Sequence, residues 1–213
     1  MEQIFDLQWK LNTYTLKNIG IDYHTSIVEP DQKTVWIENY RKALSAELAE
    51  LIREVKESGI GSENGKIEIV DMLHFLVSLS HIVGLQASEL PEPSDWSGEA
   101  AENESATENR ASFDQTVIDT FLHLDDLQNS VKWKWWARGG GFNAEKAKSA
   151  VEALWIDFYG MCSLFAMDQA TVERIYVGKN EINFRRQDGS YNEDAKTEED
   201  NEALVAAISA GRT

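Results

Sequence analysis

One segment limits the fold of this chain more than any other. Residues 67–85, IEIVDMLHFLVSLSHIVGL, are apolar on nearly every side of a helix. A helix of this kind has to be covered by neighbouring elements on several sides. Its polar residues follow one stripe at offsets of three, three and four: Glu68, Asp71, His74 and Ser78. Because buried carboxylates without a counter-charge are very costly, we expect a cationic group against this stripe.

A second acidic helix precedes this segment. It is expected to begin at about Thr34 as N-cap, to continue through Val55, and to stop at the turn SGIGSENG. The helix that contains the stripe is then expected to begin after Gly65 and to end near Gly84. The short connection between the two helices predicts that they pack as an antiparallel pair.

Two acid pairs stand on this helix pair, Glu47 with Glu50 and Glu68 with Asp71. An offset of three residues puts each pair on one helix face. Four converging carboxylates form an oxygen-donor site that suits Mg²⁺ or Mn²⁺ better than zinc. A di-iron bundle would instead need Glu-x-x-His motifs, which these pairs lack. The alternative to a metal site is a network of protonated or water-bridged acids.

The rest of the chain is also patterned as helix. Only three prolines occur in 213 residues. The pattern predicts an all-α fold of about six helices in a single domain, 1–213. Residues 90–110, which are acidic and poor in apolar groups, are expected to be a loop or mobile insertion. Further helices are expected over residues 4–16, 113–131, 144–165, 169–187 and 199–209.

Charge and composition exclude several classes of partner. The 37 acidic and 20 basic residues give a net charge of −17, which disfavours nucleic acid and anionic membrane surfaces. No charge-free stretch is long enough to span a bilayer, and the N-terminus lacks the features of a signal peptide. The single Cys162 lies among apolar residues, as expected for a buried thiol in a reducing, cytoplasmic environment.

A basic helix face occurs near the end of the chain. Lys179, Asn183 and Arg186 are spaced four and three apart, so one face presents two cations and an amide. Such a face could bind phosphates that metal ions already bridge. The alternative is an ordinary surface face whose cations pair with some of the many acids.

Five short motifs occur in an order and at a spacing that resemble one known family. They are LQWKLN, ALSAELAEL, IEIVDMLHFLVSL, YVGKNEINFRRQDGSY and EEDNEAL. The chain resembles the dimeric all-α dUTPases, which belong to the all-α NTP pyrophosphatase superfamily. The resemblance implies a helical bundle whose metal site lies between two antiparallel helices. It also implies a homodimer that hydrolyses dUTP to dUMP and pyrophosphate with Mg²⁺.

The resemblance also implies residue roles. It assigns base recognition to Gln8 and Asn12, and phosphate binding to Lys179, Asn183 and Arg186. The metal ligands that it implies are the four acids already identified from their spacing, Glu47, Glu50, Glu68 and Asp71. We expect Glu47 to act as general base. His74 is expected to support a metal ligand or line the substrate pocket, the alternative being a hydrogen-bonded core histidine.

Two departures from the family pattern leave the base selectivity open. A Trp-Lys-x-Trp cluster usually follows the second motif, whereas here WKWW occurs at residues 133–136, where core packing is the expected role of most of its tryptophans. The loop after Arg186 is short, and Tyr191 and Lys196 are the candidates to replace its phosphate-binding residues. Alternatives are a dCTPase-dUTPase, a MazG-like pyrophosphohydrolase, a non-catalytic nucleotide-binding protein and a purely structural bundle.

Overall fold

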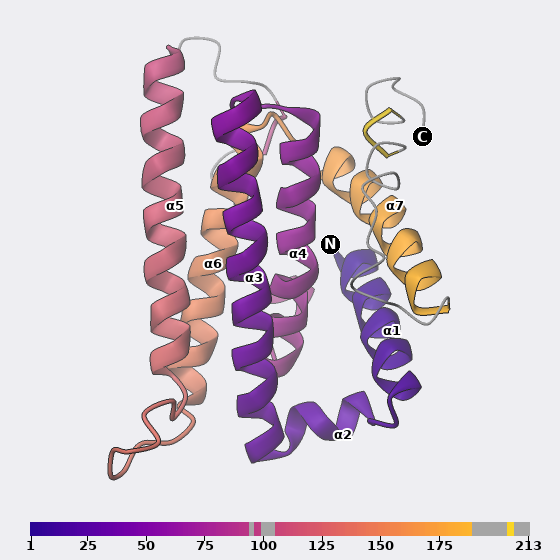
Figure 1. Ribbon diagram of the computed structural model, residues 1–213, viewed down its shortest axis with the longest axis vertical. Coiled ribbons are helices and arrows are strands. Elements are labelled where there is room, and N and C mark those ends of the chain that lie inside the picture. Colours follow the sequence, from indigo (N-terminus) through magenta and orange to yellow (C-terminus); the bar gives the residue numbers. More distant parts are fainter. Residues whose placement is uncertain (94–95, 99–104, 189–203, 207–213) are drawn as a thin grey trace.

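The computed structural model describes residues 1–93, 96–98, 105–188 and 204–206 (Figure 1). Within these ranges all regular structure is helical and no strand occurs, which confirms the predicted all-α fold. The principal helices are α1 (Glu2–Asn18), α2 (Tyr23–Val28), α3 (Pro30–Ser58), α4 (Glu63–Val83), the short 3₁₀ helix η1 (Ala87–Glu89), α5 (Ala106–Asn129), α6 (Ala144–Leu164) and α7 (Gln169–Asp188).

Helix α4 lies at the centre of the molecule. It forms an antiparallel hairpin with α3, as its sequence predicts, and it also packs against α1, α2, α6 and α7. Helices α5 and α6 form a second hairpin beside the first (Figure 1). Because α4 has neighbours around most of its circumference, its apolar side chains are almost all buried, and this accounts for the apolar character of its sequence.

The ends of α4 are set by local hydrogen bonds. Ser62 caps the N-terminus, its Oγ accepting a hydrogen bond from the backbone N–H of Gly65 at 3.1 Å. The helix therefore begins two residues before Gly65 instead of after it. A Cβ at Gly65 would lie 2.5 Å from Cε1 of Phe165, so glycine permits this close packing. Gly84 ends the helix in the left-handed conformation, as predicted.

The predicted start of α3 at Thr34 is wrong. The helix begins four residues earlier at Pro30, because proline fits the first helical position, where no N–H is needed. The hydroxyl of Thr34 instead donates a hydrogen bond to the carbonyl of Pro30 within the helix. The sequence pattern also missed α2, which is only six residues long and is capped by Asp22.

Helix α5 begins inside the segment that was expected to be a loop. Ser105 and Glu108 form a reciprocal capping box, so residues 106–110 are helical. Residues 94–95 and 99–104 of the same segment lie outside the described residues. Of the helix expected over residues 199–209, only 204–206 are described, and these are helical. Tyr191 and Lys196 also lie outside the described ranges.

The prediction that the WKWW tryptophans pack in the core is wrong for Trp135 and Trp136. These side chains are 83% and 62% exposed, and they lie in the connection between α5 and α6. A loop beyond the ends of a helical hairpin has neighbours on few sides, so it cannot bury bulky side chains within its own chain.

Over the described part of the chain, no single helix has the length and apolar character needed to cross a membrane. Helices α6 and α7 meet those criteria only as a pair, and that pair is bent by 103° at its junction.

Candidate active site and metal centre

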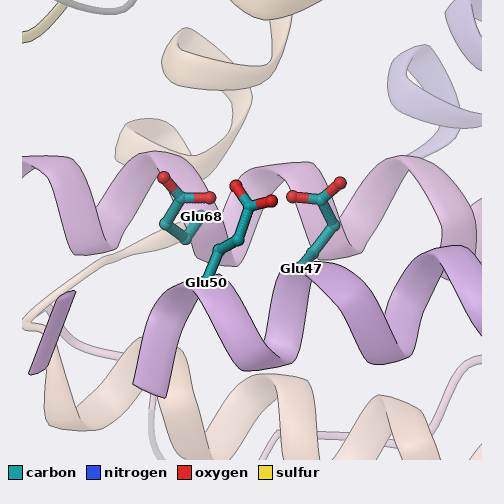
Figure 2. Close-up of side chains that lie close together, drawn as sticks. All are labelled: Glu47, Glu50 and Glu68. Atoms are coloured by element: carbon teal, nitrogen blue, oxygen red, sulfur yellow. The ribbon is translucent and has the colours of Figure 1, made fainter. Parts of the chain in front are cut away.

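Three carboxylates meet between α3 and α4. Glu47 and Glu50 extend from one face of α3, and Glu68 extends from the adjacent turn of α4 (Figure 2). One carboxylate oxygen from each lies within 4.8 Å of the other two. We call these three residues the carboxylate cluster. The spacing of three on α3 and the antiparallel hairpin together bring the side chains to one point.

The electrostatics of the cluster are dominated by Glu68. This side chain is only 6% exposed, and burial raises its pKa to about 8, with further upward contributions from Asp71, Glu47 and Glu50. Asn64 donates a hydrogen bond to its Oε1 at 3.3 Å and another to Oε2 of Glu54 at 3.1 Å. Negative charge is therefore unfavourable here unless a cation is present.

The donor set suits a hard divalent cation. Carboxylate oxygens are the ligands that Mg²⁺ and Mn²⁺ prefer, and a bound cation would offset the burial and the neighbouring negative charge that raise the pKa of Glu68. The mutual distances of the oxygens in the cluster allow several of them to contact one ion. The three residues therefore fit a magnesium or manganese centre.

The fourth predicted ligand, Asp71, lies one turn further along α4 and contacts a different partner. Its Oδ2 is 2.8 Å from Nζ of Lys179 on α7, and both side chains are largely buried. The cation expected against the polar stripe of α4 is thus partly supplied by α7. Sequence reasoning considered only the charges of the adjacent helix α3, because the packing of α7 on α4 joins residues over a hundred positions apart.

Further along α4, the polar stripe joins a buried set of hydrogen bonds with α1. Nε2 of Gln8 donates to Oδ1 of Asn12 at 2.8 Å. Nδ2 of Asn12 in turn donates to the hydroxyls of Tyr23 at 3.0 Å and Ser78 at 2.9 Å. We call these residues, together with His74 and Tyr176, the amide network. Both residues predicted to recognise the base are therefore buried and oriented by neighbours on other helices.

The hydrogen bonds of His74 define its tautomer. Its Nδ1 lies 2.8 Å from Oε1 of Gln8, an acceptor that also receives the hydroxyl of Tyr176 at 2.6 Å. Nδ1 must therefore carry the proton, which leaves Nε2 of a neutral ring as an acceptor. Burial lowers the pKa of His74 to about 3, with a smaller contribution from Lys179. Nε2 has no hydrogen-bond partner in the described structure.

A cavity of about 320 Å³ lies beside this network. Five residues that were predicted to bind substrate line this cavity. They come from α1, α4 and α7: Gln8, Asn12, His74, Asn183 and Arg186. The volume is at the lower end of the range for small-molecule sites. Lys179, the remaining predicted phosphate-binding residue, instead contacts Asp71.

Aromatic side chains that sequence reasoning did not assign to the site form another part of the cavity wall. Trp36 and Tyr40 stack with ring centroids 5.7 Å apart, and Phe75 lies 6.2 Å from Tyr40. In the sequence, only the spacing of four between Trp36 and Tyr40 indicates that these two side chains share one face of the acidic helix. Flat aromatic rings beside amide groups favour a ligand with a planar polar ring.

The cluster and the cavity are close together. Glu68 and His74 are six residues apart on one helix, which corresponds to roughly 9 Å along its axis. One ligand could therefore place a planar ring among the aromatic side chains and an anionic chain near the carboxylates, provided that cations offset the negative charge there.

Comparison with known proteins identifies a family for most of the chain. A search of curated proteins gave no match. A family model described as dUTPase matches residues 1–191, a stretch that spans α1 to α7 and includes every residue of the cluster, the network and the cavity. This chain therefore belongs to the all-α dUTPase family.

Proposed function

We propose that this protein hydrolyses dUTP to dUMP and pyrophosphate and depends on Mg²⁺, which Mn²⁺ can replace. Membership of the dUTPase family supports a nucleoside triphosphate pyrophosphatase activity. The observation that carries the proposal is the position of the carboxylate cluster beside a cavity lined by amides and aromatic rings. We further propose that the active form is a homodimer, as the family resemblance implies.

The cavity suits a pyrimidine base. Trp36, Tyr40 and Phe75 offer ring faces and edges, while the amides of Gln8 and Asn12 are held in place by buried partners. The unpartnered Nε2 of His74 is an acceptor, and uracil carries a donor N–H at N3 where cytosine carries an acceptor. This difference favours dUTP over dCTP.

The triphosphate would extend from the cavity toward the cluster. Arg186 and Asn183 line the cavity on α7, and Lys179 lies two turns before Arg186 on the same helix. Glu47, Glu50 and Glu68 would hold Mg²⁺, with Asp71 as a further ligand. The bound cations would offset charge on the triphosphate and on the departing pyrophosphate. We assign to Glu47 the acceptance of a proton from the attacking water.

A panel of nucleoside triphosphates tests the proposal directly. Pyrophosphate release is measured for dUTP, dCTP, dTTP and UTP, with and without Mg²⁺. We expect dUTP to be the best substrate, activity to need the cation, and Glu47→Ala or Asp71→Ala to lower turnover at least about hundredfold. The matched control is Glu145→Ala, an exposed acid at the start of α6. Near-native turnover in Glu47→Ala would show that the assignment is wrong.

A further inference from the structure

A second cavity lies between α1 and η1, and we call it the α1–η1 cavity. Its volume of about 420 Å³ is within the range of small-molecule sites. Four residues at offsets of three, one and three line it from one face of α1: Glu2, Phe5, Asp6 and Trp9. His81 in the last turn of α4 and residues 86–88 form the other side. None of the described residues that line it belongs to the carboxylate cluster, the amide network or the cavity beside that network.

The inner wall of the α1–η1 cavity is aromatic. The ring of His81 contacts those of Phe5 and Trp9 nearly at right angles, with centroids 5.4 and 5.3 Å apart. Phe5 also stacks on Trp155 at 6.1 Å, and Trp9 packs against Tyr23 at 5.0 Å. The core therefore holds both rings in place before a ligand binds, which lowers the entropic cost of binding.

The rim of the cavity is acidic. Glu2 and Asp6 are exposed and stand about one helical turn apart, and neither forms an ion pair with a described residue. Burial lowers the pKa of His81 to about 4, although Asp6 partly opposes this shift. The imidazole is therefore neutral at pH 7, and the charge of the lining is that of its two carboxylates.

Cations beside the cavity are engaged elsewhere or face solvent. Nζ of Lys148 lies 3.3 Å from Oε1 of Glu89, and the N-terminal ammonium of Met1 lies 3.2 Å from Oε1 of Glu173. Lys10 is exposed and is not part of the lining. The two carboxylates at the rim are therefore available to a cationic ligand.

Carboxylates above aromatic rings favour a ligand that is both cationic and partly apolar. Aromatic faces attract ammonium groups, and sites of this kind bind quaternary ammonium ligands. A metal ion fits less well, because among the described residues only the carboxylate cluster brings three donor atoms within 4.8 Å of one another. An anionic ligand would be repelled by Glu2 and Asp6.

We propose that the α1–η1 cavity binds a small organic ammonium ion, with the charged nitrogen near Glu2 and Asp6 and the carbon groups against Phe5 and Trp9. The site is separate from the proposed hydrolysis, because it uses another face of α1 and needs neither metal nor nucleotide. Primary and quaternary ammonium ions share this chemistry. Two probes distinguish them, putrescine for the primary amines and choline for the quaternary ions.

Calorimetric titration of each probe into the full chain, in EDTA at pH 7, tests the site. We expect at least one probe to bind with one site per chain. Trp9→Leu should weaken this binding at least about fivefold, because the ring face is lost. Asp6→Asn should weaken it about threefold. The neutral analogues 1,4-butanediol and 3,3-dimethylbutan-1-ol should bind at least about fivefold more weakly than putrescine and choline, respectively.

Matched controls separate this site from a general attraction of cations to an acidic protein. Glu145→Gln changes the net charge as Asp6→Asn does, at an exposed position of α6, and should leave the affinity unchanged. Glu47→Ala, which alters the carboxylate cluster, and Trp135→Leu, which removes an exposed ring elsewhere, should also bind normally. Circular dichroism checks that each variant is folded. If Trp9→Leu does not fold, the exposed Asp6→Asn decides.

Four outcomes would overturn the proposal. Neither probe binds at millimolar concentration, Trp9→Leu and Asp6→Asn both bind as the wild type does, Glu145→Gln weakens binding as much as Asp6→Asn, or Glu47→Ala abolishes it. None of these outcomes depends on pyrophosphate release from dUTP, so a failure of this site leaves the proposed reaction in place.

Discussion

The carboxylate cluster and the amide network lie on successive turns of α4, yet their physical states are opposite. In the cluster, burial and the neighbouring acids raise the pKa of Glu68 to about 8. In the network, neutral groups satisfy one another, and His74 stays neutral because its pKa falls to about 3. The network is thus neutral and held together before a ligand arrives, with Nε2 of His74 as its one acceptor without a partner among the described residues, whereas the cluster needs a cation to carry its charge.

The difference comes from the helices that pack against α4. Helix α3 brings Glu47 and Glu50 to the cluster, while α1 brings Gln8 and Asn12 to the network. Lys179 of α7 lies between the two regions, against Asp71. One buried helix therefore supports a charged site and a neutral site because its neighbours differ from turn to turn.

The largest effect is expected from removing one charge of the cluster. Glu68→Gln should lower Mg²⁺-dependent pyrophosphate release at least about hundredfold, since a ligand to the cation is lost. The same variant should unfold at a higher temperature than the wild type in EDTA, because it replaces a carboxyl group whose charged form is disfavoured by burial and by the neighbouring acids with a neutral amide. Thermal unfolding with and without Mg²⁺ measures the second effect. A variant that unfolds at a lower temperature in EDTA would contradict the account of the cluster.

Breaking the network should have a smaller effect that does not depend on metal. Asn12→Ala removes three buried hydrogen bonds, those of Asn12 with Gln8, Tyr23 and Ser78, so the free energy of unfolding should fall by roughly 2 kcal/mol. Urea unfolding in EDTA and in Mg²⁺ should give the same loss. Thr13→Ala, on the exposed face of α1, is the control. A loss that Mg²⁺ reverses would contradict the separation of the two regions.

The smallest expected effect is a difference in pH dependence. The pKa of Glu68 is raised from 4.5, so its protonated form stabilises the fold, and that contribution is lost as pH rises toward 8. The pKa of His74 is lowered from 6.5, so stability is lost as pH falls below 6.5.

Of these two groups, only Glu68 changes the stability between pH 6.5 and 8. The melting temperature in EDTA should therefore fall by roughly 4 °C over this interval. Mg²⁺ or Glu68→Gln should remove this fall. A melting temperature that rises over the same interval would contradict the sign assigned to the cluster.

Contacts between residues that are close in sequence could be predicted from the sequence, whereas contacts between distant residues could not. The meeting of Glu47, Glu50 and Glu68 followed from helical spacing and one short turn, so sequence alone was enough to predict it. The contact of Lys179 with Asp71 and the exposure of Trp135 depend on how distant helices pack, which periodicity does not report. Gln8 and Asn12 came from the family resemblance, and only the fold shows how the network orients them.

Calorimetric titration of Mg²⁺ into the metal-free protein tests the central claim most directly. The wild type should bind the cation and release protons at pH 7, because the raised pKa leaves Glu68 largely protonated before the cation binds. Glu68→Gln should bind much more weakly and release fewer protons, while Glu145→Ala should match the wild type. Wild-type binding that is absent, or that Glu68→Gln leaves unchanged, would contradict a metal centre built on the carboxylate cluster.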